Sequence, residues 1–203
     1  MINLKLILDS IFSPKLVFQK IISYEIKLSV LIEAIIFIAL VNAIFTFTSN
    51  YLIYSNNVEE ENLIFLYYEN VLKKPLLLVF LEIFKILFIT TVITYLGKVF
   101  GGKGSFINLL KCVIWIHFIL IFINIILFGA IFLNIYISSY LIMLANIWIL
   151  WVLSECATKA HSFKSTFLVF IVGIIILVIL ITLLLQVLNS SDIVFLERVS
   201  SNV

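Results

Sequence analysis

Residues 107–154 read INLLKCVIWIHFILIFINIILFGAIFLNIYISSYLIMLANIWILWVLS and contain one charged side chain, that of Lys111. A helix of these 48 residues would be roughly 72 Å long, about twice the ~30 Å hydrocarbon core of a bilayer. The length therefore predicts two membrane-crossing helices, near 107–131 and 138–156, joined by a turn. The polar residues that mark this turn are Asn134, Ser138 and Ser139.

The rest of the chain has the same apolar bias. Of its 203 residues, 64% are hydrophobic and 12% are charged, and the mean hydropathy is +1.28. A globular domain is about 45–50% apolar and about 25% charged, so this chain could not cover a water-exposed surface. The composition excludes a soluble enzyme, a nucleic-acid-binding domain and a disordered chain. The expected partner is the lipid bilayer, not nucleic acid.

Three further segments are long and apolar enough to cross a membrane, and they cover residues 28–48, 76–96 and 166–187. None of the five has the alternating polarity of strands in a membrane barrel. In lipid each must satisfy its own backbone hydrogen bonds as an α-helix. The expected fold class is therefore all-α, a polytopic membrane bundle of five transmembrane helices with a short N-terminal amphipathic helix. The expected parts are an N-terminal segment (1–27), the five-helix transmembrane domain (28–187) and a polar C-terminal tail (188–203).

The lysines indicate the orientation of this bundle. Nine of them fall in segments that the five-span topology places on one side of the membrane: Lys5, Lys15, Lys20, Lys27, Lys98, Lys103, Lys111, Lys159 and Lys164. The opposite side has Lys73, Lys74 and Arg198, and Lys85 lies within a span. Because cytoplasmic loops carry an excess of Lys and Arg, we expect a cytoplasmic N-terminus and a C-terminus on the opposite side.

A short helix is predicted before the first span. Ser13 is expected to be its N-cap and Pro14 its first helical residue. Its apolar stripe is expected to comprise Leu16, Val17, Ile21 and Ile22, opposite Lys15, Gln19 and Lys20. Such a helix is expected to lie on the cytoplasmic face, with its lysines near anionic lipid head groups.

Four of the six glycines fall in residues 97–105, GKVFGGKGS. The spacing imitates a phosphate-binding P-loop, but Gly104 stands where that motif needs Ser or Thr, and the motif follows a membrane helix instead of a strand. We therefore expect a tight cytoplasmic turn whose glycines adopt positive φ angles. A lipid-phosphate contact through Lys98 and Lys103 is compatible with it. The candidate residues of the turn are Gly97, Gly101, Gly102, Lys103 and Gly104.

Charged side chains inside the spans are the second candidate site. Glu33, Glu82 and Lys85 each cost roughly 2.5–3.5 kcal/mol or more near the bilayer centre. Glu82 and Lys85 are three residues apart, so they share a helix face and can partly neutralise each other. Lys85 and His117 lie at similar depth, roughly 15 Å from the cytoplasmic ends of their helices, and Glu33 lies about 8 Å deep. A cluster of Glu33, Lys85 and His117 facing the bundle interior is therefore geometrically feasible.

Two interpretations of this polar cluster stay open. One is a proton or ion relay, and the other is a polar clamp, meaning interhelical polar contacts that fix helix packing. The clamp is favoured because five spans leave little room for a buried transport path in a single copy. Residues that could join the clamp are Asn42, Asn124 and Asn146.

The sequence offers little for catalysis. Zinc needs three or four close ligands, but the only histidines are His117 and His161 and there is no H-E-x-x-H motif. No serine–histidine or paired-carboxylate arrangement stands out, and Cys112 and Cys156 are expected to act as small hydrophobic residues. We therefore expect no enzyme activity, no catalytic residue, no metal and no cofactor.

Three stretches, in order, resemble the Yip1-domain family of small polytopic membrane proteins. Residues 11–21, IFSPKLVFQKI, are similar to the proline-containing segment before the first span of that family. Residues 97–106, GKVFGGKGSF, resemble its Gly-Gly-x-Gly-Ser-Phe connection. The stretch from Ile147-Trp148 to His161-Ser162-Phe163 is similar to its tryptophan-bearing fourth span and the following turn. The resemblance covers about residues 8 to 187.

The resemblance implies five helices and a cytoplasmic N-terminus. The eukaryotic members of the family are associated with membrane trafficking and small prenylated GTPases, but this chain lacks their D-L-x-G-P signature, so a GTPase partner is doubtful. The chain looks more like the compact bacterial branch. We expect a non-enzymatic integral membrane protein that organises membrane or recruits membrane-protein partners through its cytoplasmic face, as one copy or as a homo-oligomer. The alternative is a small ion or solute transporter, or a channel-like protein, that uses the buried charges.

Overall fold

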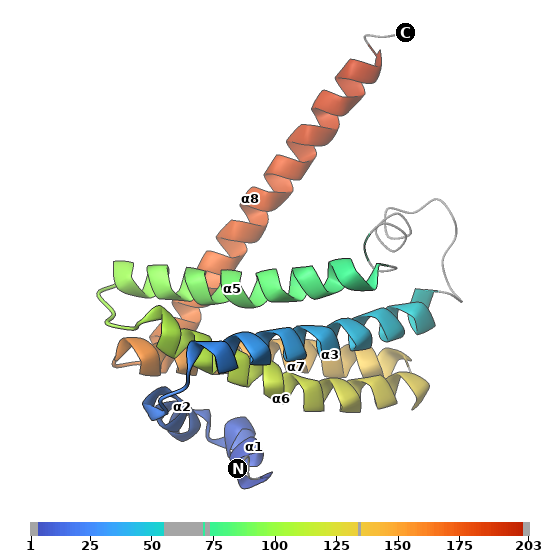
Figure 1. Ribbon diagram of the computed structural model, residues 1–203. Coiled ribbons are helices and arrows are strands. Elements are labelled where there is room, and N and C mark those ends of the chain that lie inside the picture. The colour runs from blue at the N-terminus through green and yellow to red at the C-terminus, as the bar shows by residue number, and fades with distance from the viewer. Residues whose placement is uncertain (1–3, 55–70, 72–73, 134, 201–203) are drawn as a thin grey trace.

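The computed structural model describes residues 4–54, 71, 74–133 and 135–200, and its described elements are helices (Figure 1). Two short helices come first, α1 (Leu4–Phe12) and α2 (Pro14–Ser23). Five long helices follow: α3 (Leu28–Tyr54), α5 (Pro75–Val99), α6 (Phe106–Leu133), α7 (Ile135–His161) and α8 (Thr166–Ser200). Each of the five contains a segment long and apolar enough to cross a membrane. The predicted all-α bundle of five membrane-crossing helices is confirmed.

Helix α6 lies at the centre of the bundle and contacts α2, α3, α5 and α7. One of its faces carries Leu109, Cys112 and Ile116, which pack against buried residues of α2 and α7. Another carries Leu110, Val113 and Ile114, which pack against α3 and α5. The sequence is apolar around the whole helix, as expected for a helix surrounded by others.

Helix α2 packs against α6 and α7, and the residues that it buries differ from the predicted stripe. Pro14 is the first helical residue, as predicted, but the Ser13 side chain makes no capping hydrogen bond. Val17, Phe18 and Ile21 are buried, whereas Leu16 is 68% exposed. The predicted stripe is correct at Val17 and Ile21 and wrong at Leu16, and it omitted Phe18, which packs against buried residues of α6 and α7.

Helix α8 leaves the bundle. Figure 1 shows it running at a steep angle away from the other long helices, which lie alongside one another. It contacts α7 near its start, where Phe170 packs edge-on against Trp151 with ring centroids 5.5 Å apart. The candidate span Thr166–Leu183 contains no fully buried residue. The helix continues past the expected domain boundary at residue 187, as far as Ser200.

Candidate functional site

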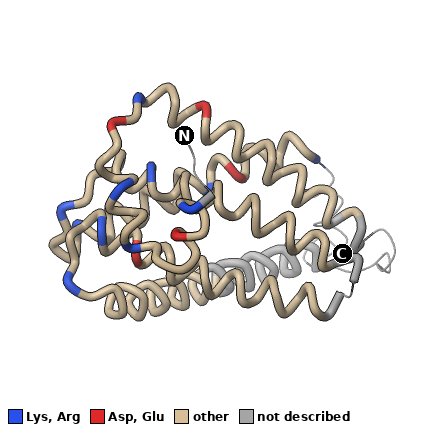
Figure 2. The backbone as a smooth tube through the Cα atoms, turned by 90° about the horizontal axis from the view of Figure 1, so that it is seen from below, with Lys and Arg blue, Asp and Glu red and all other residues tan. Residues whose placement is uncertain are grey.

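Three separate segments meet at one end of the bundle: helix α2, the α5–α6 turn (residues 97–105) and the α7–α8 turn (residues 161–165) (Figure 1). Figure 2 shows most of the described lysines at this end of the backbone. We call these three segments the lysine-rich end. They contain most of the residues that the sequence analysis assigned to the cytoplasmic face.

The α5–α6 turn is built around the imidazole ring of His161, which is 2% exposed. A Cβ atom added at Gly97, Gly102 or Gly104 would lie less than 3 Å from an atom of this ring. Real Cβ atoms do not approach other groups so closely. These three positions therefore require glycine because His161 occupies the space that a side chain would fill.

Positive φ angles explain only one glycine of this turn. Gly101 has a φ of 80°, and it follows the end of α5. The Gly102 N–H donates to the Gly97 carbonyl at 2.8 Å, and the Gly101 N–H donates to the Lys98 carbonyl at 2.9 Å. This is the Schellman pattern of a helix C-terminus, with glycine in the left-handed position. The prediction that the glycines provide positive φ is correct for Gly101 and wrong for Gly97, Gly102 and Gly104.

Hydrogen bonds fix the His161 ring in one tautomer. The Gly104 backbone N–H donates to Nδ1 at 3.0 Å, so Nδ1 carries no proton. Nε2 lies 3.2 Å from the Ile93 carbonyl and is the atom that must carry the ring proton to donate there. The Phe163 ring stacks on the imidazole, with centroids 5.4 Å apart. The Lys103 N–H also donates to the His161 carbonyl at 3.2 Å. His161 thus joins α5, the α5–α6 turn and the α7–α8 turn.

Lys111 links α6 to the C-terminal end of α2 at the lysine-rich end. Its side chain is 8% exposed, and Nζ donates to the Tyr24 carbonyl at 2.7 Å, to the Ile22 carbonyl at 3.3 Å and to Asn108 Oδ1 at 3.4 Å. The two carbonyls lie at the C-terminal end of α2, where the helix dipole favours a cation. In the sequence, Lys111 is taken to indicate only the orientation, although its isolation in an apolar stretch is also typical of a buried polar role.

The predicted intramembrane cluster is brought together only in part. Glu82 and Lys85 form an ion pair within α5, with side chains 15% and 46% exposed. His117 is buried, and its Nδ1 lies 2.9 Å from the Val113 carbonyl one turn earlier. Glu33, in contrast, is exposed on α3, so the structure does not bring it into an interior cluster.

Of the three asparagines suggested for the clamp, two form a contact between helices and one does not. Asn124 Nδ2 donates to Asn42 Oδ1 at 3.3 Å, which links α6 to α3. Asn146 is exposed on α7. The polar contact between membrane helices therefore includes Asn42 and Asn124 but not Asn146.

Groups that could support redox or metal chemistry are few. Cys112 and Cys156 are free, fully buried and part of the apolar contact between α6 and α7. Among the described residues, no group of three or more His, Cys, Asp and Glu side chains could hold a metal ion.

The fold and this end of the molecule define the class: a polytopic α-helical membrane protein with most of its described lysines at one end. The family model of the Yip1 domain matches residues 8–187. The chain belongs to the Yip1-domain family, as the resemblance of its three motifs predicted. Comparison with curated proteins and with solved structures finds no significant match.

Proposed function

We propose that this chain is a non-enzymatic membrane scaffold whose lysine-rich end faces the cytoplasm and recruits partner proteins or organises the membrane. The carrying observation is the set of contacts around His161. They join turns that are far apart in the sequence, since Gly104 and His161 are separated by 57 residues. A surface held in this way loses little conformational freedom when a partner binds, and this favours recognition.

The orientation is the first part of the proposal to test. The native cysteines Cys112 and Cys156 are fully buried, which keeps background labelling low. In sealed vesicles, Lys103→Cys should react with a membrane-impermeant maleimide from the cytoplasmic side, and Ser201→Cys from the opposite side. Labelling of Ser201→Cys only from the cytoplasm would falsify the proposed orientation.

Recruitment is tested by photo-crosslinking in the native membrane. A photoreactive residue at Lys103, which is exposed in the α5–α6 turn, should give adducts of discrete mass. The same photoreactive amino acid placed at Tyr140, which is 67% exposed near the start of α7, serves as the control.

Gly102→Val, which places a side chain against His161, should remove the adducts, whereas Gly129→Val, whose Cβ meets open space, should retain them. Adducts that persist unchanged in folded Gly102→Val protein would count against a partner surface at this end.

The alternative function is transport. The observation that favours it is the Glu82–Lys85 ion pair on α5 together with the buried His117 on α6, a helix that α5 contacts. In liposomes, a pH-dependent flux that disappears in stable Lys85→Met protein would support a relay. Absence of flux in the unaltered protein would leave the scaffold as the supported function.

A further inference from the structure

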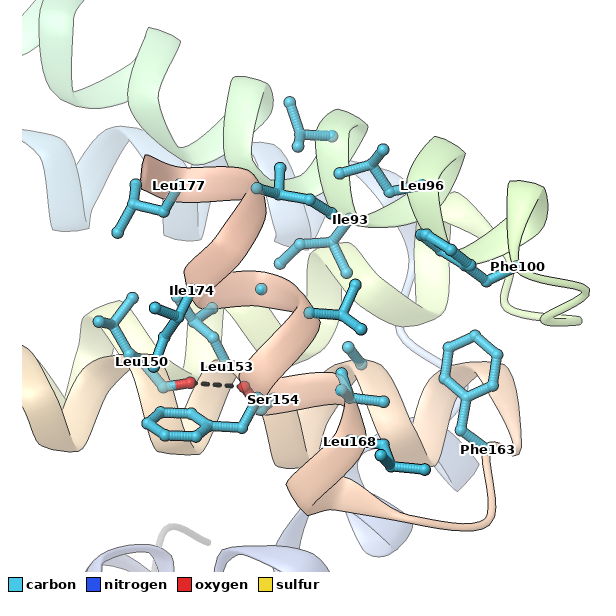
Figure 3. A pocket seen from close by; sticks show the side chains of 18 of the residues that line it. Ile93, Leu96, Phe100, Leu150, Leu153, Ser154, Phe163, Leu168, Ile174 and Leu177 are labelled. Carbon is cyan, nitrogen blue, oxygen red and sulfur yellow. Dashed lines mark hydrogen bonds between the residues drawn. The ribbon is translucent and has the colours of Figure 1, made fainter. Parts of the chain in front are cut away.

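An apolar groove lies between α5, α7 and the first half of α8 (Figure 3). Its volume is about 480 Å³, within the range of about 300–1,000 Å³ typical of small-molecule sites. Labelled side chains that line it include Ile93, Leu96, Leu153, Leu168, Ile174 and Leu177. Its walls come from α5, α7 and α8, the helix that diverges from the bundle.

The walls of this groove suit a hydrocarbon chain. Apart from Lys164 and Ser165 at one end, Ser154 provides the one polar side chain among its described lining residues. The Ser154 hydroxyl already donates to the Leu150 carbonyl at 2.8 Å, as the dashed line in Figure 3 shows. A polar ligand would therefore find no free hydrogen-bonding side chain inside the groove, whereas an acyl chain needs none.

A second, basic pocket adjoins the lysine-rich end of the groove. It has a volume of about 380 Å³, lies between α2 and the α7–α8 turn, and shares Phe163 and Lys164 with the groove. Its polar lining includes Lys15, Gln19, Lys159, Ser162, Lys164 and Thr166, and no Asp or Glu is among its described lining residues. Glu155 is buried one turn before Lys159 and does not line the pocket.

We propose that the groove and the basic pocket together bind one anionic phospholipid. One of its two acyl chains lies between α5, α7 and α8, and its phosphate lies among Lys15, Lys159 and Lys164. Charge complementarity selects this occupant: a helix of a second copy would cover the apolar walls but would leave three lysines without an anion. Basic pockets beside membrane helices are suited to anionic head groups. This proposal does not depend on the recruitment of a protein partner.

The test measures lipid retained by the full-length protein, purified in a neutral detergent with equal amounts of phosphatidylglycerol and phosphatidylcholine that have identical acyl chains. Native mass spectrometry counts the bound lipids. The unaltered protein should retain phosphatidylglycerol in preference. The triple variant Lys15→Gln/Lys159→Gln/Lys164→Gln should lower that preference about tenfold or more, because each lysine contributes to anionic-lipid binding. The control Lys5→Gln/Lys27→Gln/Lys74→Gln removes the same charge outside the pocket and should change it little.

A second variant tests the acyl chain. Gly173 lines the groove, and a Cβ there meets nothing within 4 Å, so Gly173→Phe fills the groove without a clash at its base. It should lower the retention of both lipids several-fold. Gly129→Phe is the matched control, since Gly129 also faces open space but lies outside the groove.

Three results would overturn the proposal. The first is an equal loss of preference in the control triple variant, which would indicate general surface charge. The second is unchanged lipid retention in folded Gly173→Phe. The third is a change of oligomeric state in Gly173→Phe with lipid retention intact, which would assign the groove to a second copy of the chain.

Discussion

The two histidines of this chain are both buried but are held in opposite ways. His161 is 2% exposed, and its ring is bonded by the Gly104 N–H and the Ile93 carbonyl, far from it in the sequence. His117 is 4% exposed, and its ring nitrogen pairs with a carbonyl of its own helix, that of Val113. His161 joins separate segments, whereas the contact of His117 stays within its own helix.

This difference separates two regions of the molecule. At the lysine-rich end, the conformation of each turn depends on another turn. A substitution that moves the His161 ring should therefore alter the conformation of both turns. In the middle of the bundle, Glu82 pairs with Lys85 on the same helix, and His117 pairs with Val113 on the same helix. Substitutions that break one of these pairs should have smaller and more local effects than substitutions that place a side chain against the His161 ring.

The largest effect is expected from Gly97→Val. Replacing glycine within a helix ordinarily favours the helix, but here the new side chain would collide with the His161 ring. We expect a loss of about 3 kcal/mol in the free energy of unfolding, measured by SDS titration in mixed micelles. Gly129→Val, in open space, should lose far less.

A double-mutant cycle identifies the cause of that loss. If the clash with the ring is responsible, the double variant Gly97→Val/His161→Ala should lose much less free energy of unfolding than the two single variants lose in sum. Strict additivity of the two losses would show that Gly97 is required for a reason other than His161.

The ion pair in α5 should give the next largest effect. Lys85→Met leaves the Glu82 carboxylate without its cation in an apolar setting, and we expect a loss of about 2 kcal/mol. The neutral pair Glu82→Gln/Lys85→Met should recover most of it if the pair serves packing alone. A double variant as unstable as the single one contradicts this view of the pair.

The sequence was sufficient to predict the five spans because about 20 apolar residues have few alternatives to a membrane helix. It located the glycine turn but not its cause, since the cause is a ring supplied by His161, 57 residues beyond Gly104. Depth alone suggested that Glu33 faces inward. The rotational phase of α3 could not be read, because its sequence is apolar on nearly all sides, and the structure leaves Glu33 exposed.

A smaller effect is expected from His117→Leu. It removes a local hydrogen bond but also removes a polar ring from an apolar interior, and the two changes oppose each other. The free energy of unfolding should change by about 1 kcal/mol or less in the SDS titration. A loss as large as that in Gly97→Val would mean that His117 bonds to another helix and that the contrast between the histidines is wrong.

The smallest effect concerns the end of α7, which repeats the geometry of the end of α5 with a different residue. The Phe163 N–H donates to the Thr158 carbonyl at 2.9 Å, and Ser162 occupies the left-handed position with a φ of 60°, where α5 has Gly101.

A left-handed conformation costs a non-glycine residue roughly 1–2 kcal/mol, and the greater chain entropy of glycine offsets about half of that. Ser162→Gly should therefore stabilise the protein by about 0.5 kcal/mol, while Gly101→Ser should destabilise it by a similar amount. If Ser162→Gly instead destabilises the protein, then the serine side chain contributes a contact that its backbone geometry does not reveal, and the basic pocket that it lines is the place to look for that contact.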